Sequence, residues 1–518
     1  MSAAGQAAGP DAGPQRVPAM PGVATPVAHR ALITFCVILA TLMQSLDSTI
    51  ANVALPYMQG TMAASQDEIN WVLTSYIVAA AIMTAPTGFL AARFGRTRVF
   101  VVAVAGFTVA SILCGLAESL EEIVIFRVLQ GMFGASLVPL SQAVMYDIYP
   151  PAERGRAMSL WTMGVMMGPI CGPILGGWLT DNYNWRWVFY INVPFGILTV
   201  IGLLLFMPDT KHSATAKLDW LGFGTLSLSL GAFQMMLDRG ETKDWFYSPE
   251  IIVEAVLAAL GLYLFLVQCF LSPKPFLTPA LFKDRNFVVG LILYSMIGLT
   301  MYATLALLAP YLQNLMNYPV VTAGIALAPR GAGLMLTALV TGRIINHVSP
   351  RILVALGFLI GAWVMYEMTG WTPDVAQSTV WITGFMQGVS IGFLTIPINL
   401  ITFATLPAAL RTEGTGVYSL VRNLGSAIGI SVTGALLQNN TQINHASIAA
   451  HITPFNRVFE AGAPSWWNPA TAQGASLLNA EITRQATIIA YMDNFKLMLI
   501  LSLAVLPLLL LTRPVKTS

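Results

Sequence analysis

The sequence predicts an all-α polytopic membrane protein whose helices form two similar bundles. Of its 518 residues, 56% are hydrophobic and only 10% are charged, whereas soluble domains carry about 25% charged residues. Apolar stretches of about 20 residues, the length of a helix that crosses about 30 Å of hydrocarbon, recur from Ala31 to the end. Segments of the first half also reappear, in order, in the second. We therefore expect fourteen transmembrane helices arranged 6+2+6, with the two outer sets related by a pseudo-twofold axis.

The apolar stretches define the expected spans and domains. The spans are predicted at 31–55, 69–91, 99–117, 121–145, 158–180, 187–207, 218–237, 250–271, 287–311, 322–345, 352–371, 378–404, 415–437 and 493–512. Residues 1–30 are rich in Ala, Pro and Gly and lack the apolar core of a signal peptide, so we expect a disordered tail. The remaining divisions are a six-helix bundle at 31–207, a two-helix insert with flanking loops at 208–286, a second six-helix bundle at 287–512 and a tail at 513–518.

The distribution of positive charge predicts the orientation in the membrane. An even number of spans leaves both termini on one side, and most loop arginines and lysines lie on that side. The opposite loops hold few, chiefly Arg186, Arg239, Lys243, Arg457 and Arg484. By the positive-inside rule, both termini are expected in the cytoplasm.

The outer side carries one long loop, at 438–490. It contains Trp466, Trp467 and a polar, helix-compatible stretch at 475–490. Because most connections between helices have about 4–6 residues, this periplasmic loop is too long to be a simple connector.

The composition and the motifs exclude several classes of protein. Twenty-six basic against 24 acidic residues give a net charge of +2, which is too small for a nucleic-acid binder. All four cysteines lie in apolar runs, where buried thiols are expected rather than disulfides or metal ligands, and the five histidines have no metal-ligand spacing. No HExxH motif, Walker loop or large extramembrane segment is present, so we expect neither an enzyme, nor ATP drive, nor a cofactor.

The internal repeat has an ordered pattern. The segment PTGFLAARFGRTRVF (86–100) corresponds to VTGRIINHVSPRIL (340–353), and LQGMFGASLVP followed by YPPAERGRAMSL (129–160) corresponds to MQGVSIGFLTIP followed by LPAALRTEGTGVYSL (386–420). The pair Gln130 and Gly131 matches Gln387 and Gly388. Such a repeat is typical of transporters built from two similar halves.

Asp47 and Arg127 are the candidate proton-coupling residues. Asp47 lies about eight residues, or about 12 Å, below the outer end of its span, and Arg127 lies about six residues, or about 9 Å, below the outer end of the fourth span. Desolvation favours the protonated carboxyl, whereas a nearby cation favours the ionised form. We therefore hypothesise that Asp47 takes a proton from the outer side and releases it inward under the influence of Arg127. A static ion pair, or an Asp bonded to its neighbouring backbone, is the alternative.

Other polar residues in the spans are weaker candidates. Five of them could bind substrate or could simply bond neighbouring helices: Gln44, Ser48, Asn52, Gln130 and Asn399. Arg422 is a further intramembrane cation, next to Asn423, to which we assign no partner. In the fifth span Gly164, Gly168, Gly172 and Gly176 recur at every fourth position, with Pro169, Pro173 and Gly177 beside them, and form a strip that another helix can approach closely.

Several segments resemble, in order, motifs of the fourteen-span drug:proton antiporters of the EmrB/QacA type in the major facilitator superfamily. They are LDSTIANVALP (46–56), GFLAARFGRTR (88–98), RVLQGMFGA (127–135) and GVMMGPICGPILGGWL (164–179), followed by DNYNWRWVFYINVPFG (181–196) and MLDRGETKDWF (236–246). The family's usual acidic residue in the second motif is replaced by Ala92.

The resemblance implies the major facilitator fold and a pump of the bacterial inner membrane. Such a pump expels hydrophobic compounds in exchange for protons by alternating access. It also implies docking onto a periplasmic adaptor of the EmrA type and an outer-membrane channel of the TolC type, for which the long outer loop is the natural candidate.

For two motifs the resemblance adds a role beside a simpler one. The cytoplasmic loop residues Gly88, Arg93, Gly95, Arg96 and Arg98 would form an inner-gate clamp, although the arginines also satisfy the orientation rule. The glycine strip would resist proton leak, although tight packing alone explains it equally well.

A second transport function stays open from the sequence. A carrier for one metabolite, such as a fatty or aromatic acid, would be favoured by several buried cations. We expect only two within the spans, Arg127 and Arg422.

Overall fold

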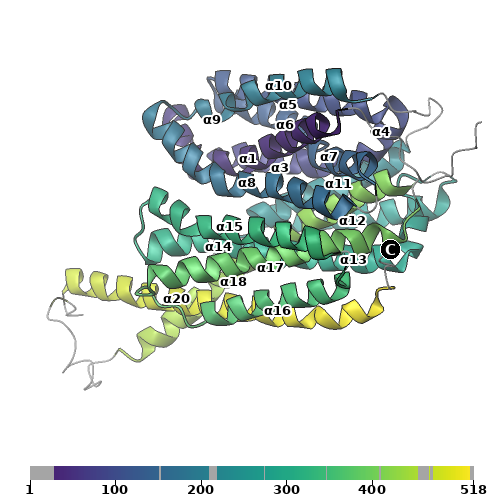
Figure 1. Cartoon of the computed structure of the whole chain (residues 1–518). Helices are drawn as coiled ribbons and strands as arrows, with labels where there is room; N and C mark the ends of the chain where they lie inside the picture. Colours follow the sequence, from purple (N-terminus) through teal and green to yellow (C-terminus); the bar gives the residue numbers. More distant parts are fainter. Residues whose placement is uncertain are drawn as a thin grey trace, which may run out of the picture.

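The computed structural model describes residues 29–150, 153–208, 219–273, 275–345, 347–407, 410–452, 466 and 471–513. These residues form helices, turns and loops, with no strand among them. In Figure 1 the purple-to-blue helices of the first half pack above the green-to-yellow helices of the second half. The all-α prediction is confirmed for the described residues.

The first half contains ten helical segments. They are α1 (Arg30–Met62), α2 (Gln66–Ile69), α3 (Trp71–Thr84), α4 (Thr87–Phe94), α5 (Arg96–Leu116), α6 (Leu120–Gly134), α7 (Leu137–Ile148), α8 (Arg154–Asn182), α9 (Trp187–Tyr190) and α10 (Asn192–Phe206). The axis bends by 54° between α3 and α4, where Pro86 interrupts the helical hydrogen bonds. Gly95 adopts a positive φ of 89° between α4 and α5, a conformation that costs little only for glycine.

The insert consists of α11 (Trp220–Arg239), the short η2 (Trp245–Tyr247) and α12 (Pro249–Leu271). The two long helices approach closely, because Gly261 packs on the backbone around Ser229. The insert also contacts both halves: α11 packs on α3 and on α18, and the Ser431 hydroxyl of α18 donates to the Leu237 carbonyl at 2.8 Å.

The second half begins with η3 (Pro279–Lys283) and α13 (Arg285–Ile297). Its first long helix is interrupted by two π-helical segments, η4 (Gly298–Tyr302) and η5 (Tyr311–Leu315), which flank α14 (Ala303–Pro310). The other elements are α15 (Val320–Ile344), α16 (Pro350–Met368), α17 (Gln377–Ala404), α18 (Arg411–Ala450), α20 (Ala472–Ala504) and η8 (Leu506–Leu511).

The number of spans agrees only in part with the predicted fourteen. In the described part of the chain, twelve helices are long and apolar enough to cross a membrane, or thirteen if the bent pair α3 and α4 is one span. The predicted fifth span corresponds to α8, which is 29 residues long and is not among those twelve. The count of fourteen and the domain limits stay predictions.

The two halves contact each other along α8 and α15 and where α7 packs on α18. A side chain on Gly155 of α8 would meet Ile345, just after α15, and the Tyr146 hydroxyl of α7 bonds the Asn399 side chain of α17. In the predicted orientation the Gly155–Ile345 contact and the Tyr146–Asn399 bond lie on the cytoplasmic side.

The long outer loop is largely helical. Helix α18 continues to Ala450 and α20 starts at Ala472, so both extend well beyond the predicted apolar spans. Their ends project away from the bundle at the lower left of Figure 1. Trp466 is exposed, whereas Trp467 lies outside the described residues.

Candidate functional site

Asp47 and Arg127 form a buried ion pair in the first half. Helix α1 supplies Asp47 and α6 supplies Arg127, and the Arg127 Nη1 and Asp47 Oδ2 atoms are 2.7 Å apart. The exposed fractions of the two side chains are only 0% and 1%. The structure thus brings together the two residues that the depth argument placed at similar levels, while their part in proton coupling stays a proposal.

The second carboxylate oxygen of Asp47 accepts from two neutral amides. Gln130 Nε2 of α6 donates to Asp47 Oδ1 at 2.8 Å, and Asn192 Nδ2 of α10 donates to the same atom at 3.1 Å. Both amides also donate to the Ser111 hydroxyl of α5. The carboxylate therefore accepts three hydrogen bonds, an environment that stabilises its ionised form.

Arg127 has partners besides the carboxylate. Its Nε donates to the Val72 carbonyl at 3.0 Å and its Nη1 to Gln130 Oε1 at 2.8 Å. Its guanidinium carbon also lies 4.1 Å from the ring centroid of Tyr76, in cation–π geometry. These neutral partners can hold the guanidinium in place whether or not Asp47 is ionised.

The glycine strip of α8 holds the Asp47 segment of α1. A side chain on Gly164 would meet Ile38, one on Gly168 would meet Ser45, and one on Gly172 would meet Thr49, whereas Gly176 faces Ile50 and Gly177 lies farther away, near Val53. Ser45 and Thr49, on either side of Asp47, donate to the carbonyls of Val165 and Gly168 at 2.5 and 3.2 Å. Pro169 and Pro173 belong to α8, but their side chains lie outside the described part.

The five candidate substrate residues separate into two groups. Gln130 belongs to the ion-pair network, and Asn399 is bonded to Tyr146 across the two halves. Gln44, Ser48 and Asn52 lie on one stripe of α1, four residues apart. Gln44 Nε2 bonds the Tyr76 hydroxyl at 3.4 Å, whereas Ser48 and Asn52 are exposed. Only this α1 stripe therefore remains open to a ligand.

The cytoplasmic loop residues surround the junction of α4 and α5. Arg96 pairs with Asp147 of α7, and Arg93 lies 5.7 Å from the Phe94 ring centroid. Gly88 is buried in α4, which packs against α18 of the second half, and Arg98 is exposed. The junction thus lies at the interface of the halves, as a clamp requires. The inner-gate clamp and the simple orientation role of the arginines both stay predictions.

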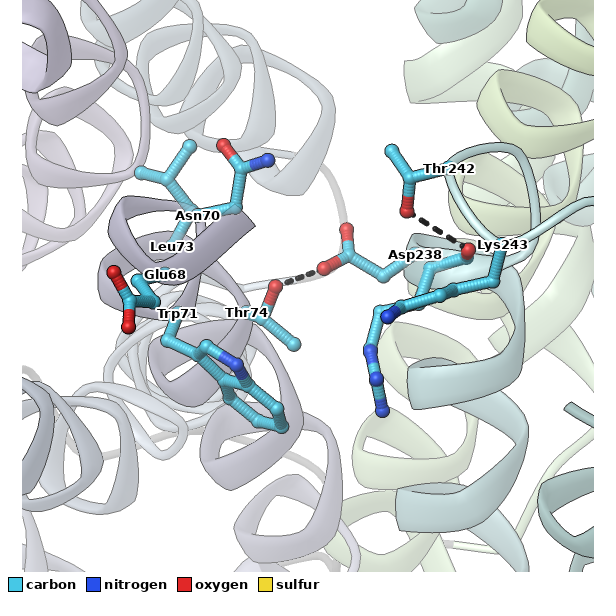
Figure 2. A pocket seen from close by; sticks show the side chains of 9 residues that line it. Glu68, Asn70, Trp71, Leu73, Thr74, Asp238, Thr242 and Lys243 are labelled. Carbon is cyan, nitrogen blue, oxygen red and sulfur yellow. Dashed lines mark hydrogen bonds between the residues drawn. The ribbon is translucent and has the colours of Figure 1, made fainter. Parts of the chain in front are cut away.

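A cavity of about 300 Å³ lies between α3 and the insert, and its lining includes Trp71, Asp238 and Lys243. Figure 2 shows the hydrogen bond between Thr74 and Asp238 that joins its two walls. Glu68 belongs to the same lining, and hydrogen bonds from the backbone and hydroxyl of Ser65 hold its pKa below the usual value.

The second half contains a buried cation that the sequence analysis overlooked. Arg330 of α15 has an exposed fraction of 7%, so the expectation that only Arg127 and Arg422 lie within the spans is wrong. Arg330 lies inside the predicted span 322–345, and the helix continues through Pro329. Sequence reasoning also left Asn192, Ser111 and Tyr76 out of the site, although an Asn at the start of an apolar span was a usable signal.

Comparisons with known proteins agree with this architecture. Residues 37–430 match the model of the Major Facilitator Superfamily. The fatty acid resistance protein FarB of Neisseria gonorrhoeae is 36% identical and is matched over 93% of this chain and 96% of its own length. The multidrug export protein EmrB of Haemophilus influenzae is 35% identical, over 90% of this chain and 92% of its own length.

Solved structures support the fold alone. The proton:xylose symporter XylE gives a TM-score of 0.58 at 13% identity, over 91% of this chain and 95% of its own. A bacterial homologue of the lysosomal transporter Spinster, in an inward-facing state, gives 0.55 at 18% identity, over 92% and 97%. The chain is therefore a multi-pass membrane transport protein that belongs to the major facilitator superfamily, in the group that contains EmrB and FarB.

Proposed function

We propose that this protein is a proton-coupled antiporter that exports hydrophobic or amphipathic compounds across the bacterial inner membrane by alternating access. The observation that carries the proposal is the buried pair of Asp47 and Arg127. A charge within the bilayer costs about 2.5–3.5 kcal/mol on insertion scales, so such residues are usually functional. The relatives named as a multidrug export protein and a fatty acid resistance protein support this class of cargo.

The proposed coupling step is a change of proton occupancy on Asp47. In the described conformer three hydrogen bonds, one of them from the adjacent guanidinium, favour the ionised carboxyl. Protonation from the outer side removes the negative charge and weakens the bond from Arg127, which keeps Val72, Gln130 and Tyr76 as partners. When the halves rock and open inward, the carboxyl loses its proton and the pair forms again.

The proton gradient supplies enough energy for this cycle. One proton moving through about 100 mV yields about 2.3 kcal/mol, and one pH unit adds about 1.4 kcal/mol. Together they support a gradient of roughly a few-hundred-fold for a neutral solute. One proton per turnover is therefore sufficient.

The test is dye uptake into inverted membrane vesicles with an imposed pH gradient. Replacing Asp47→Asn should abolish gradient-driven uptake while the protein stays in the membrane at the wild-type level. Asp493→Asn is the control, because Asp493 is partly exposed and pairs only with Lys496 on α20. Gradient-driven uptake at the wild-type rate by Asp47→Asn would reject the proposal.

We further propose that both termini are cytoplasmic and that the helical ends of α18 and α20 dock onto a periplasmic adaptor, as the inner-membrane part of a tripartite pump. The support is geometric: α18 has 40 residues, or about 60 Å of helix, which is twice the thickness of the hydrocarbon core. Two apolar side chains on the projecting ends, Ile443 and Leu477, are exposed.

Co-purification with a co-expressed EmrA-type adaptor tests the docking surface. The double variant Ile443→Asp/Leu477→Asp should lose the adaptor yet keep wild-type dye uptake in inverted vesicles, where no adaptor is needed. Retention of the adaptor by this variant would place the docking surface elsewhere.

A further inference from the structure

The second half contains two buried or partly buried cations without a counter-ion. Arg330 is buried in α15, and Arg422 is partly buried in α18. No carboxylate of the described residues lies within ion-pair distance of either guanidinium. The ionisable side chains that act most strongly on Arg422 are the tyrosines Tyr294 and Tyr302.

The hydrogen bonds of Arg330 are also incomplete, and those of Arg422 go to neutral groups. Arg330 Nη2 donates to the Met301 carbonyl at 3.0 Å, whereas its Nη1 is buried without a partner among the described residues. Arg422 donates to the Asn423 carboxamide oxygen, at 3.3 Å from Nε and 3.1 Å from Nη2. Among the described residues both cations thus bond neutral acceptors, and Arg330 keeps a buried donor for an anion.

The two arginines are connected by one structural element. Helix η4 carries Met301 and Tyr302, and Tyr302 lies close enough to interact electrostatically with both guanidinium groups. On the other side, η4 packs directly on the Arg422 backbone through Gly298. A π-helical turn inside a membrane helix is frequently part of a functional site.

A second unsatisfied group lies on the neighbouring helix. Gln387 of α17 is fully buried, and neither its carboxamide oxygen nor its nitrogen has a partner in the described part of the chain. The next residue, Gly388, packs on the Arg330 carbonyl. Buried polar groups are normally bonded to protein, water or ligand, so this part of the second half has polar capacity that the protein itself does not fill.

We propose that Arg330, Arg422 and Tyr302 form a binding site for the acidic headgroup of an amphipathic organic anion, whose apolar tail occupies the surrounding apolar core. The inference rests on the proposed export function and specifies the charge of one class of cargo. Carboxylates fit the planar donors of arginine and form strong, charge-assisted hydrogen bonds with them.

The test compares two ligands with the same tail and opposite charge, dodecanoate and dodecyltrimethylammonium. Binding is measured by titration calorimetry on the purified full chain in nonionic detergent at pH 8. Wild-type protein should bind dodecanoate, and Arg330→Gln and Arg422→Gln should each weaken that binding at least tenfold without weakening the cation. Arg422→Lys should recover part of the affinity, because it restores the charge but not the planar donors.

The control variant is Arg343→Gln, on the same helix as Arg330 but exposed and, among the described residues, bonded to a backbone carbonyl of its own helix. It should leave both affinities unchanged. Equal weakening of the anion and the cation, or no weakening by Arg422→Gln, would overturn the proposal. Arg422 is partly exposed, so this variant keeps the test decisive if Arg330→Gln does not fold.

The outcome is separable from that of the proposed function. Calorimetry measures binding without a proton gradient, and Asp47→Asn should bind dodecanoate normally while it fails in the vesicle assay. If wild-type protein drives dye uptake by the gradient but does not bind dodecanoate, the anion site is wrong and the antiporter proposal stands.

Discussion

The two halves carry buried polar groups at corresponding positions, but these groups differ in charge. In the first half Gly131 of α6 packs on the Tyr76 carbonyl of α3, and in the second half Gly388 of α17 packs on the Arg330 carbonyl of α15. Arg330 therefore takes the place of Tyr76. The repeat has kept the close backbone contact and changed the side chain beside it.

The matching glutamines show the same divergence. Gln130 bonds Asp47, Ser111 and Arg127, whereas Gln387 has no partner among the described residues. The first half thus encloses a neutral, satisfied ion pair, and the second half holds cations without a counter-ion. The two halves thus share a backbone arrangement, but one holds a paired charge and the other holds unpaired cations among the described residues. This difference is the physical basis for assigning proton exchange to the first half and headgroup binding to the second.

Removal of one cation from each half should give the largest contrast in stability. Arg127→Leu leaves Asp47 buried without its partner, which should cost about 3–5 kcal/mol. Arg330→Leu removes a cation that has no counter-ion, so it should leave stability unchanged or raise it. The measurement is thermal unfolding of the purified protein in detergent.

The double variant Asp47→Leu/Arg127→Leu is the control for that contrast, and it should recover most of the loss because no charge is left unpaired. A comparable loss for Arg330→Leu would show that the two centres are not electrostatically different.

Substitution of the corresponding glycines should have a smaller effect that is similar in both halves. A methyl group at Gly131 or Gly388 would fall on a backbone carbonyl of the neighbouring helix, and overpacking of this kind costs about 1–3 kcal/mol. Gly60→Ala is the matched control, since nothing lies within 4 Å of a side chain there. Thermal unfolding of the three alanine variants checks this, and a loss in only one half would mean that the shared backbone contact is not equally tight.

Replacement of the matching glutamines should affect stability differently in the two halves. Gln130→Leu leaves partners of the network unbonded and should cost about 1–3 kcal/mol. Gln387→Leu replaces a side chain that already lacks partners, so in ligand-free protein it should be neutral or slightly stabilising. Melting temperatures compared without and with dodecanoate test this, and equal destabilisation by both variants would contradict it.

Particular residues show how far sequence reasoning reached. Depth counting along two spans was enough to pair Asp47 with Arg127, because helical rise is constant and both residues could be measured from the same face of the membrane. Four-residue spacing was enough to identify the strip from Gly164 to Gly176, because it marks one face of a helix. The pairing also relied on the major facilitator fold that the resemblance implies, in which the first and fourth spans line one cavity, whereas the strip needs no knowledge of neighbouring helices.

Other residues could not be placed in this way. Asn192, Ser111 and Tyr76 reach the ion pair from three further helices, and Asn399 turned out to bond Tyr146 of the other half. Arg330 lies inside a predicted span, but its burial and its lack of a counter-ion among the described residues depend on the packing of other helices. Lateral contacts between distant segments decide these cases, and no local pattern encodes them.

The sequence by itself determined the membrane class, the approximate spans, the repeat and the axial depth of each charge, because hydrophobic length and helical rise are local properties of the chain. Only the tertiary structure decided which charges are neutralised. Neutralisation depends on which side chains from other helices come within about 3 Å. The packing that gives Asp47 three donors gives Arg330 and Arg422 no acidic partner among the described residues.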